Sequence, residues 1–135
     1  MSAASNYLEN AVLDHVLGNT TYTPAGTLYL GLFTNDSSSA AANLEAGTLT
    51  DEVSGGDYGR KAITFDAASG GSSESAATVT FDAATANWGT ITHVAVMDAS
   101  TAGNVLFWGA VTTSKTIETG DTFQVSAGNL TISLA

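Results

Sequence analysis

The sequence predicts an all-β fold, a β-sandwich or jelly roll of about 7–8 strands with one N-terminal helix. Short segments with period-two alternation of apolar residues recur at near-regular spacing along the chain. Clusters of Gly, Ser, Asn and Asp separate them, which is turn chemistry. Only 12% of the residues are charged, and small polar residues take their place on the outer faces. The length of 135 residues favours one domain over residues 1–135.

The helix is predicted over residues 6–17, within an N-terminal arm of about residues 5–18. Asn6 is the expected N-cap, because Glu9 follows three residues later in a capping-box pattern. Gly18 marks the expected C-terminal end. The apolar residues at helical spacing on one face are Leu8, Ala11, Val12 and Val16. Three turns alone are marginally stable in water, so this face is expected to pack on the sheet or on a neighbour.

The strands are predicted from alternation and from their bounding turns. Residues 27–34 are apolar on both faces, which indicates a central strand. Residues 90–98 and 105–113 flank a turn at residues 99–104 and form the strongest strand pair. The other predicted strands are residues 58–65, 77–82, 122–125 and 130–134. The last two are separated by Ala127-Gly128-Asn129, which predicts a hairpin.

A long segment, about residues 35–57, shows no clear periodicity and is predicted to be a loop. It is interpreted in two ways. The first is a mobile surface loop. The second is an arm that becomes ordered against a neighbouring subunit, where Leu44, Leu49 and Val53 would bury apolar surface.

Charge and composition exclude several classes of partner. Thirteen acidic residues against three basic ones give a net charge of −10. Phosphate backbones and anionic membranes would be repelled, so neither nucleic acid nor membrane is an expected partner. The chain has no cysteine, no signal-peptide pattern at its start and no apolar run near the roughly 20 residues of a membrane helix. Synthesis in a cytoplasm is therefore expected.

No catalytic motif is found, so the protein is predicted not to be an enzyme and to need no cofactor. His15 and His93 are interpreted as hydrogen-bonded structural residues. A calcium ion held by loops through Asp98 and Asp121 is the weaker alternative to solvated turn acids. Most aromatic residues are expected in the core. The alternative is a sugar-stacking platform, for which the two tryptophans that precede glycines, Trp88 and Trp108, are the candidates.

Four stretches resemble a family of small structural proteins of tailed bacteriophages. They are the opening SNYLENAVLDHVLGNTTYTPAGTLYLGLFT, then EVSGGDYGRKAI, then WGTITHVAVMD with GNVLFWGA, and the final strand LTISL. The resemblance leaves out residues 35–51 and 66–80, and it departs from the family at Val53, where a proline is expected. Members are often labelled as tail-fibre-like proteins. The resemblance implies membership of the virion and supplies no catalytic residues.

We expect the protein to be a virion structural subunit made in the host cytoplasm. Its acidity, compactness and apolar extensions favour a capsid decoration or cement protein that bridges capsid subunits. The alternative is a tail-fibre, baseplate or neck subunit, for which binding of a host glycan is a further hypothesis. Expected partners are further copies of the chain, as a trimer, and the major capsid protein or other virion proteins. The predicted interface residues are Leu8, Val12, Val16, Leu44, Leu49 and Val53.

Overall fold

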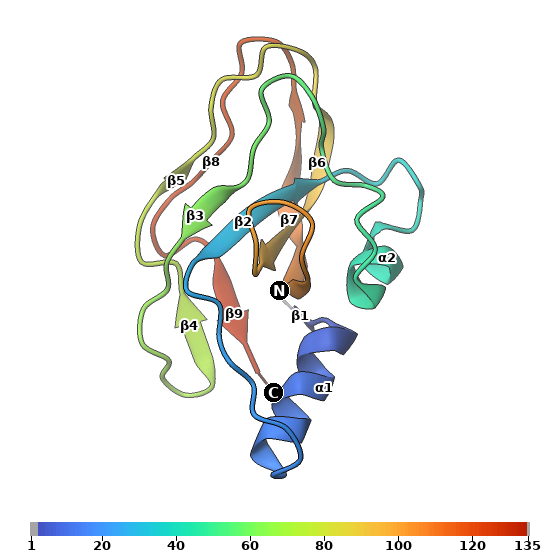
Figure 1. The fold of residues 1–135 in the computed structure, drawn as a ribbon. Coiled ribbons are helices and arrows are strands. Elements are labelled where there is room, and N and C mark those ends of the chain that lie inside the picture. Colours follow the sequence, from blue (N-terminus) through green and yellow to red (C-terminus); the bar gives the residue numbers. More distant parts are fainter. Residues whose placement is uncertain (1–2, 135) are drawn as a thin grey trace.

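The computed structural model describes residues 3–134, and this part of the chain contains nine strands and two helices. The strands are β1 (Ala3–Ala4), β2 (Leu28–Phe33), β3 (Lys61–Ile63), β4 (Ser72–Glu74), β5 (Val79–Thr80), β6 (Gly89–Met97), β7 (Val105–Ile117), β8 (Gln124–Val125) and β9 (Thr131–Ser133). The helices are α1 (Asn6–Val16) and α2 (Ala40–Ala46). The prediction of an all-β fold with an N-terminal helix is confirmed (Figure 1).

One antiparallel sheet organises the fold, with the strand order β1-β7-β6-β2-β3. Two short antiparallel ladders, β4-β9 and β5-β8, complete the strand pairing of the described residues. The second layer is therefore two separate ladders rather than a continuous sheet, and this strand order does not confirm the jelly-roll variant. The predicted β6–β7 hairpin with its turn at residues 99–104 is present.

β2 lies inside the sheet because both of its faces are apolar. Leu30 and Leu32 point to one face and Phe33 points to the other, and all three are fully buried. The larger core lies on the first face. Its buried members are Leu30, Leu32, Val53, Ile63, Val79, Phe81, Ala84, Trp88, Ile91, Val94, Ile117 and Phe123. The aromatic rings of Phe81, Trp88 and Phe123 meet edge to face in this core.

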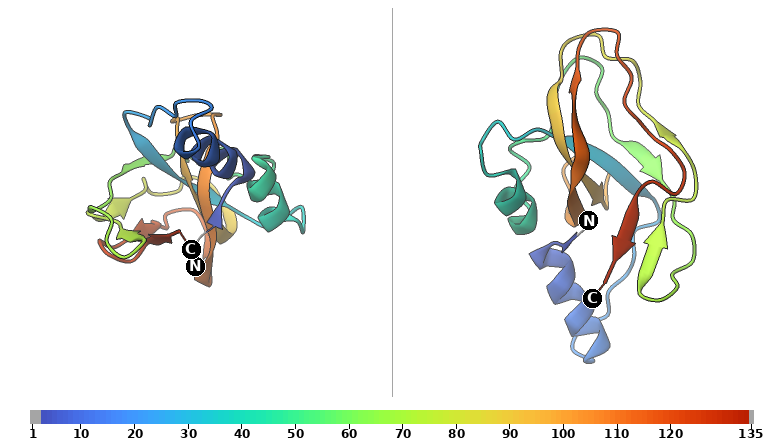
Figure 2. Two further views of the ribbon diagram at one scale, coloured as in Figure 1. Left: turned by 90° about the horizontal axis from the view of Figure 1, so that it is seen from below. Right: turned by 180° about the vertical axis from the view of Figure 1, so that it is seen from behind.

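The opposite face of the sheet carries the smaller core, which α2 covers (Figure 2). Its buried members are Phe33, Leu44, Ala95, Met97 and Val105. The indole Nε1 of Trp108 donates a hydrogen bond of 2.7 Å to the Glu45 carboxylate, which ties α2 to β7. The prediction of a loop over residues 35–57 is therefore wrong for residues 40–46, because tertiary contacts make this short segment helical.

Helix α1 spans nearly the predicted residues, but its N-cap is Ser5 rather than Asn6. The Ser5 hydroxyl accepts a hydrogen bond from the Leu8 amide at 3.3 Å and donates to the Val105 carbonyl. Leu8 is buried against the body of the protein, whereas the C-terminal end of α1 runs away from the sheet (Figure 1). The cap thus fixes the helix to β7 at one end only.

The predicted hairpin around residues 127–129 is wrong. β8 pairs with β5 and β9 pairs with β4, so the two C-terminal strands do not pair with each other. The chain turns around the buried Ser75 instead. The Ser75 amide donates to the Leu130 carbonyl at 2.9 Å, and its carbonyl accepts from the Gly128 amide at 2.7 Å. The turn chemistry of the sequence was correct, but it did not identify the partner strand.

Candidate functional site

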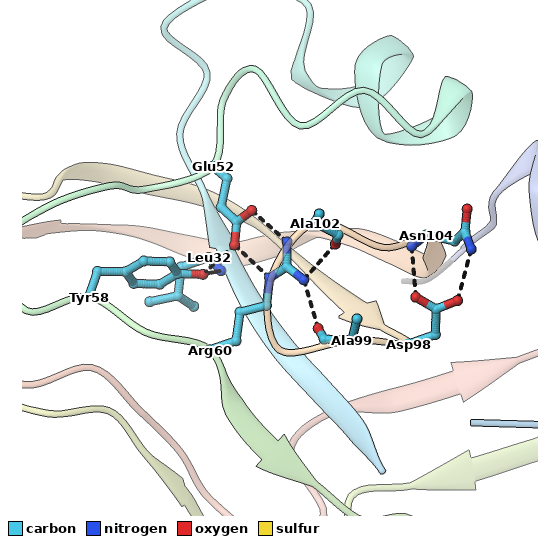
Figure 3. Close-up of polar contacts among 8 residues, drawn as sticks. All are labelled: Leu32, Glu52, Tyr58, Arg60, Asp98, Ala99, Ala102 and Asn104. Atoms are coloured by element: carbon cyan, nitrogen blue, oxygen red, sulfur yellow. Dashed lines mark hydrogen bonds and ion pairs between the residues drawn. The ribbon is translucent and has the colours of Figure 1, made fainter. Parts of the chain in front are cut away.

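A buried ion pair lies at the meeting point of three chain segments (Figure 3). The Arg60 guanidinium donates from Nε and Nη2 to the two carboxylate oxygens of Glu52, both at 2.7 Å. The Arg60 side chain is 2% exposed and the Glu52 side chain 16%. Nη1 of Arg60 donates to the carbonyls of Ala99 and Ala102 at 2.7 and 2.8 Å. This guanidinium therefore holds the β6–β7 turn and the segment after α2 together.

Tyr58 extends the ion pair into the sheet. Its hydroxyl donates to the Glu52 carboxylate and accepts from the Leu32 amide, both at 3.0 Å. Burial, followed by the charge of Glu52, raises the pKa of Tyr58 well above its usual range. Burial lowers the pKa of Arg60, but the hydrogen bonds and charge of Glu52 outweigh it, so the net shift is upward. Both groups therefore keep their protons at neutral pH and bind as donors.

The backbone between Glu52 and Tyr58 needs glycine at its tightest point. Gly56 has φ +56°, and a Cβ there would lie 2.9 Å from Nε1 of Trp88 and 3.0 Å from the Ala86 carbonyl. Nε1 of Trp88 donates to the Gly56 carbonyl at 2.9 Å. The ion pair, the glycine turn and the tryptophan form one braced unit, called the Arg60 cluster below and defined by Glu52, Gly56, Tyr58, Arg60 and Trp88.

A second polar group, centred on Asp51, holds the segment that precedes the Arg60 cluster in the sequence. Asp51 accepts hydrogen bonds from the amide and hydroxyl of Ser37, at 2.9 and 2.6 Å, and from the side-chain amide of Asn43 at 3.4 Å. The hydroxyl of Ser37 lowers the pKa of Asp51, although burial opposes the shift. Asp51 thus closes the α2 segment back onto the protein's own sheet. The Ser37 hydroxyl donates directly to the Asp51 carboxylate, so these two residues do not have the arrangement of the outer members of a Ser-His-Asp triad.

The histidines and turn acids have structural partners. Nδ1 of His15 accepts from the Tyr22 amide at 3.1 Å, and Nδ1 of His93 lies 2.8 Å from the Thr92 hydroxyl. Burial lowers the pKa of His93, with Asp51 opposing the shift. Asp98 accepts from the amide and side chain of Asn104 (Figure 3), and Asp121 from the Glu118 amide. Within residues 3–134, no three His, Asp or Glu side chains are arranged to hold a metal ion.

The two tryptophans do not form an exposed sugar platform. Trp88 is 5% exposed and lies in the larger core. Trp108 is half-buried against the smaller core and uses its indole N–H on Glu45. The expectation that most aromatic residues pack in the core holds for Trp88, and the stacking alternative loses its candidate residues.

The predicted interface residues fall into three groups. Leu8, Leu44 and Val53 are buried in the protein's own cores, with exposed fractions of 5%, 1% and 5%. Val12 and Leu49 are half-buried, and Val16 is exposed. These six residues were chosen as exposed apolar side chains, and among them Val16 is exposed in the structure. Contact between any of these residues and another virion protein stays a prediction.

The structure shows an exposed apolar surface on and directly after α1, which shares Val16 with the predicted residues. Leu13, Val16 and Leu17 are 56%, 72% and 70% exposed. We call these three residues the α1 patch. Leu13 lies about 140° around the helix axis from the buried Leu8, since successive residues are about 100° apart. The signal was present in the sequence as an apolar stripe too wide for one buried face, but the sequence did not show which side of the helix the sheet would cover.

The fold is a small, mainly β-structured body with an exposed apolar face on its N-terminal helix. Residues 3–133 match the family described as Podophage GP4 fiber I protein gp80, and the chain belongs to this family. It is thus a member of a small structural protein family of tailed phages, as the sequence resemblance indicated, and membership implies a virion component. Comparison with the curated proteins gives no match. Neither helix in the described residues is long and apolar enough to span a membrane.

Proposed function

We propose that this protein is a non-catalytic structural subunit of the phage virion that binds other virion proteins through the α1 patch. The observation that carries the proposal is the exposure of three neighbouring large apolar side chains, Leu13, Val16 and Leu17, on a helix that leaves the body of the protein. Monomeric proteins seldom leave such a group uncovered, and exposed apolar patches commonly mark binding surfaces.

The chemistry of the rest of the surface supports an apolar rather than an ionic contact. Two of the three cations are in ion pairs, Arg60 with Glu52 and Lys61 with Asp82. The net charge of −10 gives the surface a strongly negative balance. Nucleic acid is therefore not a proposed partner. A specific interface buries roughly 800 Å² on each partner, so the α1 patch would be the apolar centre of a larger contact with a polar rim.

We consider two places in the virion. The first is the capsid exterior, where the protein would act as a decoration or cement subunit that bridges capsid proteins. Its compact acidic body supports this place. The second is the tail, as a fibre, baseplate or neck subunit. The family description, which names a fiber protein of a podophage, supports the second place.

Copy number distinguishes the two places. Quantitative mass spectrometry of purified virions would measure this protein against the major capsid protein. A decoration role predicts a ratio comparable to one, together with capsids that lose resistance to heat when the subunit is removed. A tail role predicts a small fraction and immunogold labelling at the tail. Absence from purified particles would contradict the proposed function in either form.

A tip variant tests the surface itself. Leu13→Ser combined with Leu17→Ser removes two of the exposed side chains without touching the buried Leu8. We expect this variant to fold, as monitored by circular dichroism, and to be lost from particles in a complementation assay. Tyr7→Ser is the matched control, because Tyr7 is 42% exposed on the same helix but on a different face. Equal incorporation of the tip variant and the control would rule out the α1 patch.

A further inference from the structure

The outer edge of β7 has a strand partner along only part of its length. β7 has 13 residues and is the longest strand in the described part of the chain. β1 covers the start of this edge by pairing Ala3 with Trp108 and Ala4 with Phe107. Over residues 109–117, no strand within residues 3–134 pairs with the outer edge. The backbone groups on this part of the edge are therefore available to a further strand.

A β-bulge leaves further backbone groups unpaired in the same stretch. Ladder pairing between β7 and β6 is interrupted between Ala110 and Lys115. The residues in between, 111–114, lie opposite Thr92 alone and have no ladder partner on β6. Bulges occur preferentially at sheet edges and beside functional sites, where they change the direction of a strand and its side chains. The stretch therefore presents backbone amides and carbonyls to its surroundings rather than to its own sheet.

A groove beside this edge opens onto the larger core. It has a volume of about 360 Å³ and lies between β7 and the chain segment that carries β8 and β9. These two parts of the chain run side by side in the right view of Figure 2, where β7 is orange and β8 and β9 are red. Val111, Val125 and Leu130 line the groove and form a half-buried margin of the larger core. Apolar side chains placed in the groove would complete the burial of this margin.

The opposite wall of the groove also offers backbone groups. β8 pairs with β5 on one side only. The Phe81 amide donates to the Phe123 carbonyl at 2.9 Å, so Phe123 points its carbonyl toward the β5 side. Backbone groups of successive strand residues point to opposite sides, so those of Gln124 point away from β5. Gln124 lines the groove, which therefore has hydrogen-bonding backbone groups on both of its walls.

The charge around the groove indicates what kind of segment it accepts. The chain has thirteen acidic residues, yet none of those within residues 3–134 lines the groove. The charged lining residue is Lys115, which has no ion-pair partner among the described residues. A carboxylate on the occupant would give Lys115 a partner. Two copies of this chain, each with a net charge of −10, repel at long range, which disfavours a second copy as the occupant.

We propose that the groove binds an extended segment of another virion protein, which pairs with the outer edge of β7 as an added strand. The segment has apolar side chains at alternate positions, facing Val111 and Leu130, and a carboxylate that reaches Lys115. Main-chain hydrogen bonds provide the affinity of such added strands, and contacts to alternate side chains provide specificity. The inference rests on the proposed function only in taking the partner from the virion. It adds a contact surface that is separate from the α1 patch.

Hydrogen exchange, measured by mass spectrometry on the purified protein and on purified virions, tests this pairing. We expect peptides that cover residues 109–116 to exchange at least about tenfold more slowly in virions, because an added strand protects their amides. Peptides from the central strand β2 are the control and should exchange equally slowly in both samples. Equal exchange of residues 109–116 in the two samples would overturn the proposal, and the bulge would then only keep the edge unpaired. Peptides over residues 13–17 report separately on the α1 patch, so failure of one contact is distinguishable from failure of the other.

A filled groove provides the matched variants. Thr113→Trp places a large side chain in the groove from an exposed position, and Ser114→Trp places it on the next exposed residue, which does not line the groove. Circular dichroism checks that both fold. In a complementation assay, Thr113→Trp should be incorporated into virions at least about tenfold less than Ser114→Trp. Equal incorporation would overturn the proposal. Protection of residues 109–116 in the free protein at about 1 mM would assign the groove to a second copy and overturn the choice of partner.

Discussion

Replacing Arg60 by Met removes the central donor of the Arg60 cluster while keeping a side chain of similar length. The guanidinium makes four hydrogen bonds of 2.7–2.8 Å, two to Glu52 and one each to Ala99 and Ala102. The change leaves the Glu52 carboxylate, 16% exposed, without its countercharge. It also leaves the two turn carbonyls without this donor.

The expected loss of stability follows from the Glu52 charge that is left unpaired. Breaking one partner of a buried ion pair typically destabilises a protein by about 3–5 kcal/mol. Domains of this kind have a free energy of unfolding of about 5–15 kcal/mol, so Arg60→Met is expected to remove a large share of it. An unfolding entropy of about 2.1 cal/mol/K per residue gives roughly 0.3 kcal/mol/K for the whole chain. Dividing the expected loss of about 3–5 kcal/mol by this entropy gives a drop in Tm of roughly 10–17 °C.

Urea denaturation followed by tryptophan fluorescence measures this loss, with the m-value as a check on two-state behaviour. Lys61→Met is the matched control. Lys61 is the next residue and pairs with Asp82 at 2.9 Å, but the two side chains are 32% and 68% exposed, so the loss should stay below about 1 kcal/mol. The double variant Glu52→Gln with Arg60→Met should be more stable than Arg60→Met alone, because no unpaired carboxylate remains. Equal losses for Arg60→Met and Lys61→Met would refute the reasoning.

Three further predictions concern other contacts. Gly56→Ala should lower the free energy of unfolding by about 2–5 kcal/mol, because the left-handed backbone is strained and the new Cβ clashes with Trp88. Gly55→Ala is the control: its φ is +78° but no atom lies near its Cβ, so the loss in the same denaturation assay should be about 1–2 kcal/mol. Ser5→Ala should lower the free energy of unfolding by about 1–3 kcal/mol and reduce the helical circular dichroism signal, because it removes the α1 cap and the hydrogen bond to the Val105 carbonyl. No change in either measurement would show that the cap is dispensable. Burial lowers the pKa of His93 in the folded state, so its contribution to stability is present above the unfolded pKa of about 6.5 and is lost as pH falls through the lower folded pKa. His93→Gln should therefore flatten that part of the curve of unfolding free energy against pH. An unchanged slope would contradict the assignment.

The sequence predicted those elements whose pattern is local. β2, β6 and β7 have strong alternation or long apolar runs. β2 and β6 agree with their expected bounds within one residue, and β7 continues past the predicted residue 113 to Ile117. α1 ends where Gly18 was expected to end it, within two residues. Its N-cap was misplaced by one residue because the spacing to Glu9 favoured Asn6, whereas the contact to Val105 that selects Ser5 is long-range.

The elements that the sequence missed depend on tertiary contacts. α2 has seven residues, too few to be stable alone, and it forms because Leu44 packs on the sheet and Glu45 binds Trp108. β1 has two residues and is a strand only because β7 offers its edge. The pairing of β8 with β5 could not be read from the turn at Gly128, because turn chemistry specifies a reversal of the chain and not the neighbour that it meets.

The candidate interface residues on α1 belong to one apolar stripe, and the structure leaves Val16 exposed while it buries Leu8. An apolar stripe that is wider than one helix face contains both core and surface residues, and only the position of the sheet separates them. The sheet covers Leu8, so the side chains turned away from it, Leu13 and Leu17, are the exposed ones. Leu44 and Val53, which were predicted to contact a neighbour, are buried in the protein's own cores for a similar reason, since the sequence does not show which apolar side chains the sheet covers.

The stretches that carry the family resemblance converge on the Arg60 cluster. Glu52, Tyr58 and Arg60 come from one stretch, Trp88 from another, and the turn that Arg60 holds joins the β6 and β7 stretches. The two segments outside the resemblance, residues 35–51 and 66–80, lie elsewhere: the first supplies α2, and the second supplies β4 and β5. The hydrogen bonds of the Arg60 guanidinium therefore involve neither of these two segments. Exchanging residues 68–73 for the corresponding segment of another member of the family is therefore expected to leave Tm nearly unchanged.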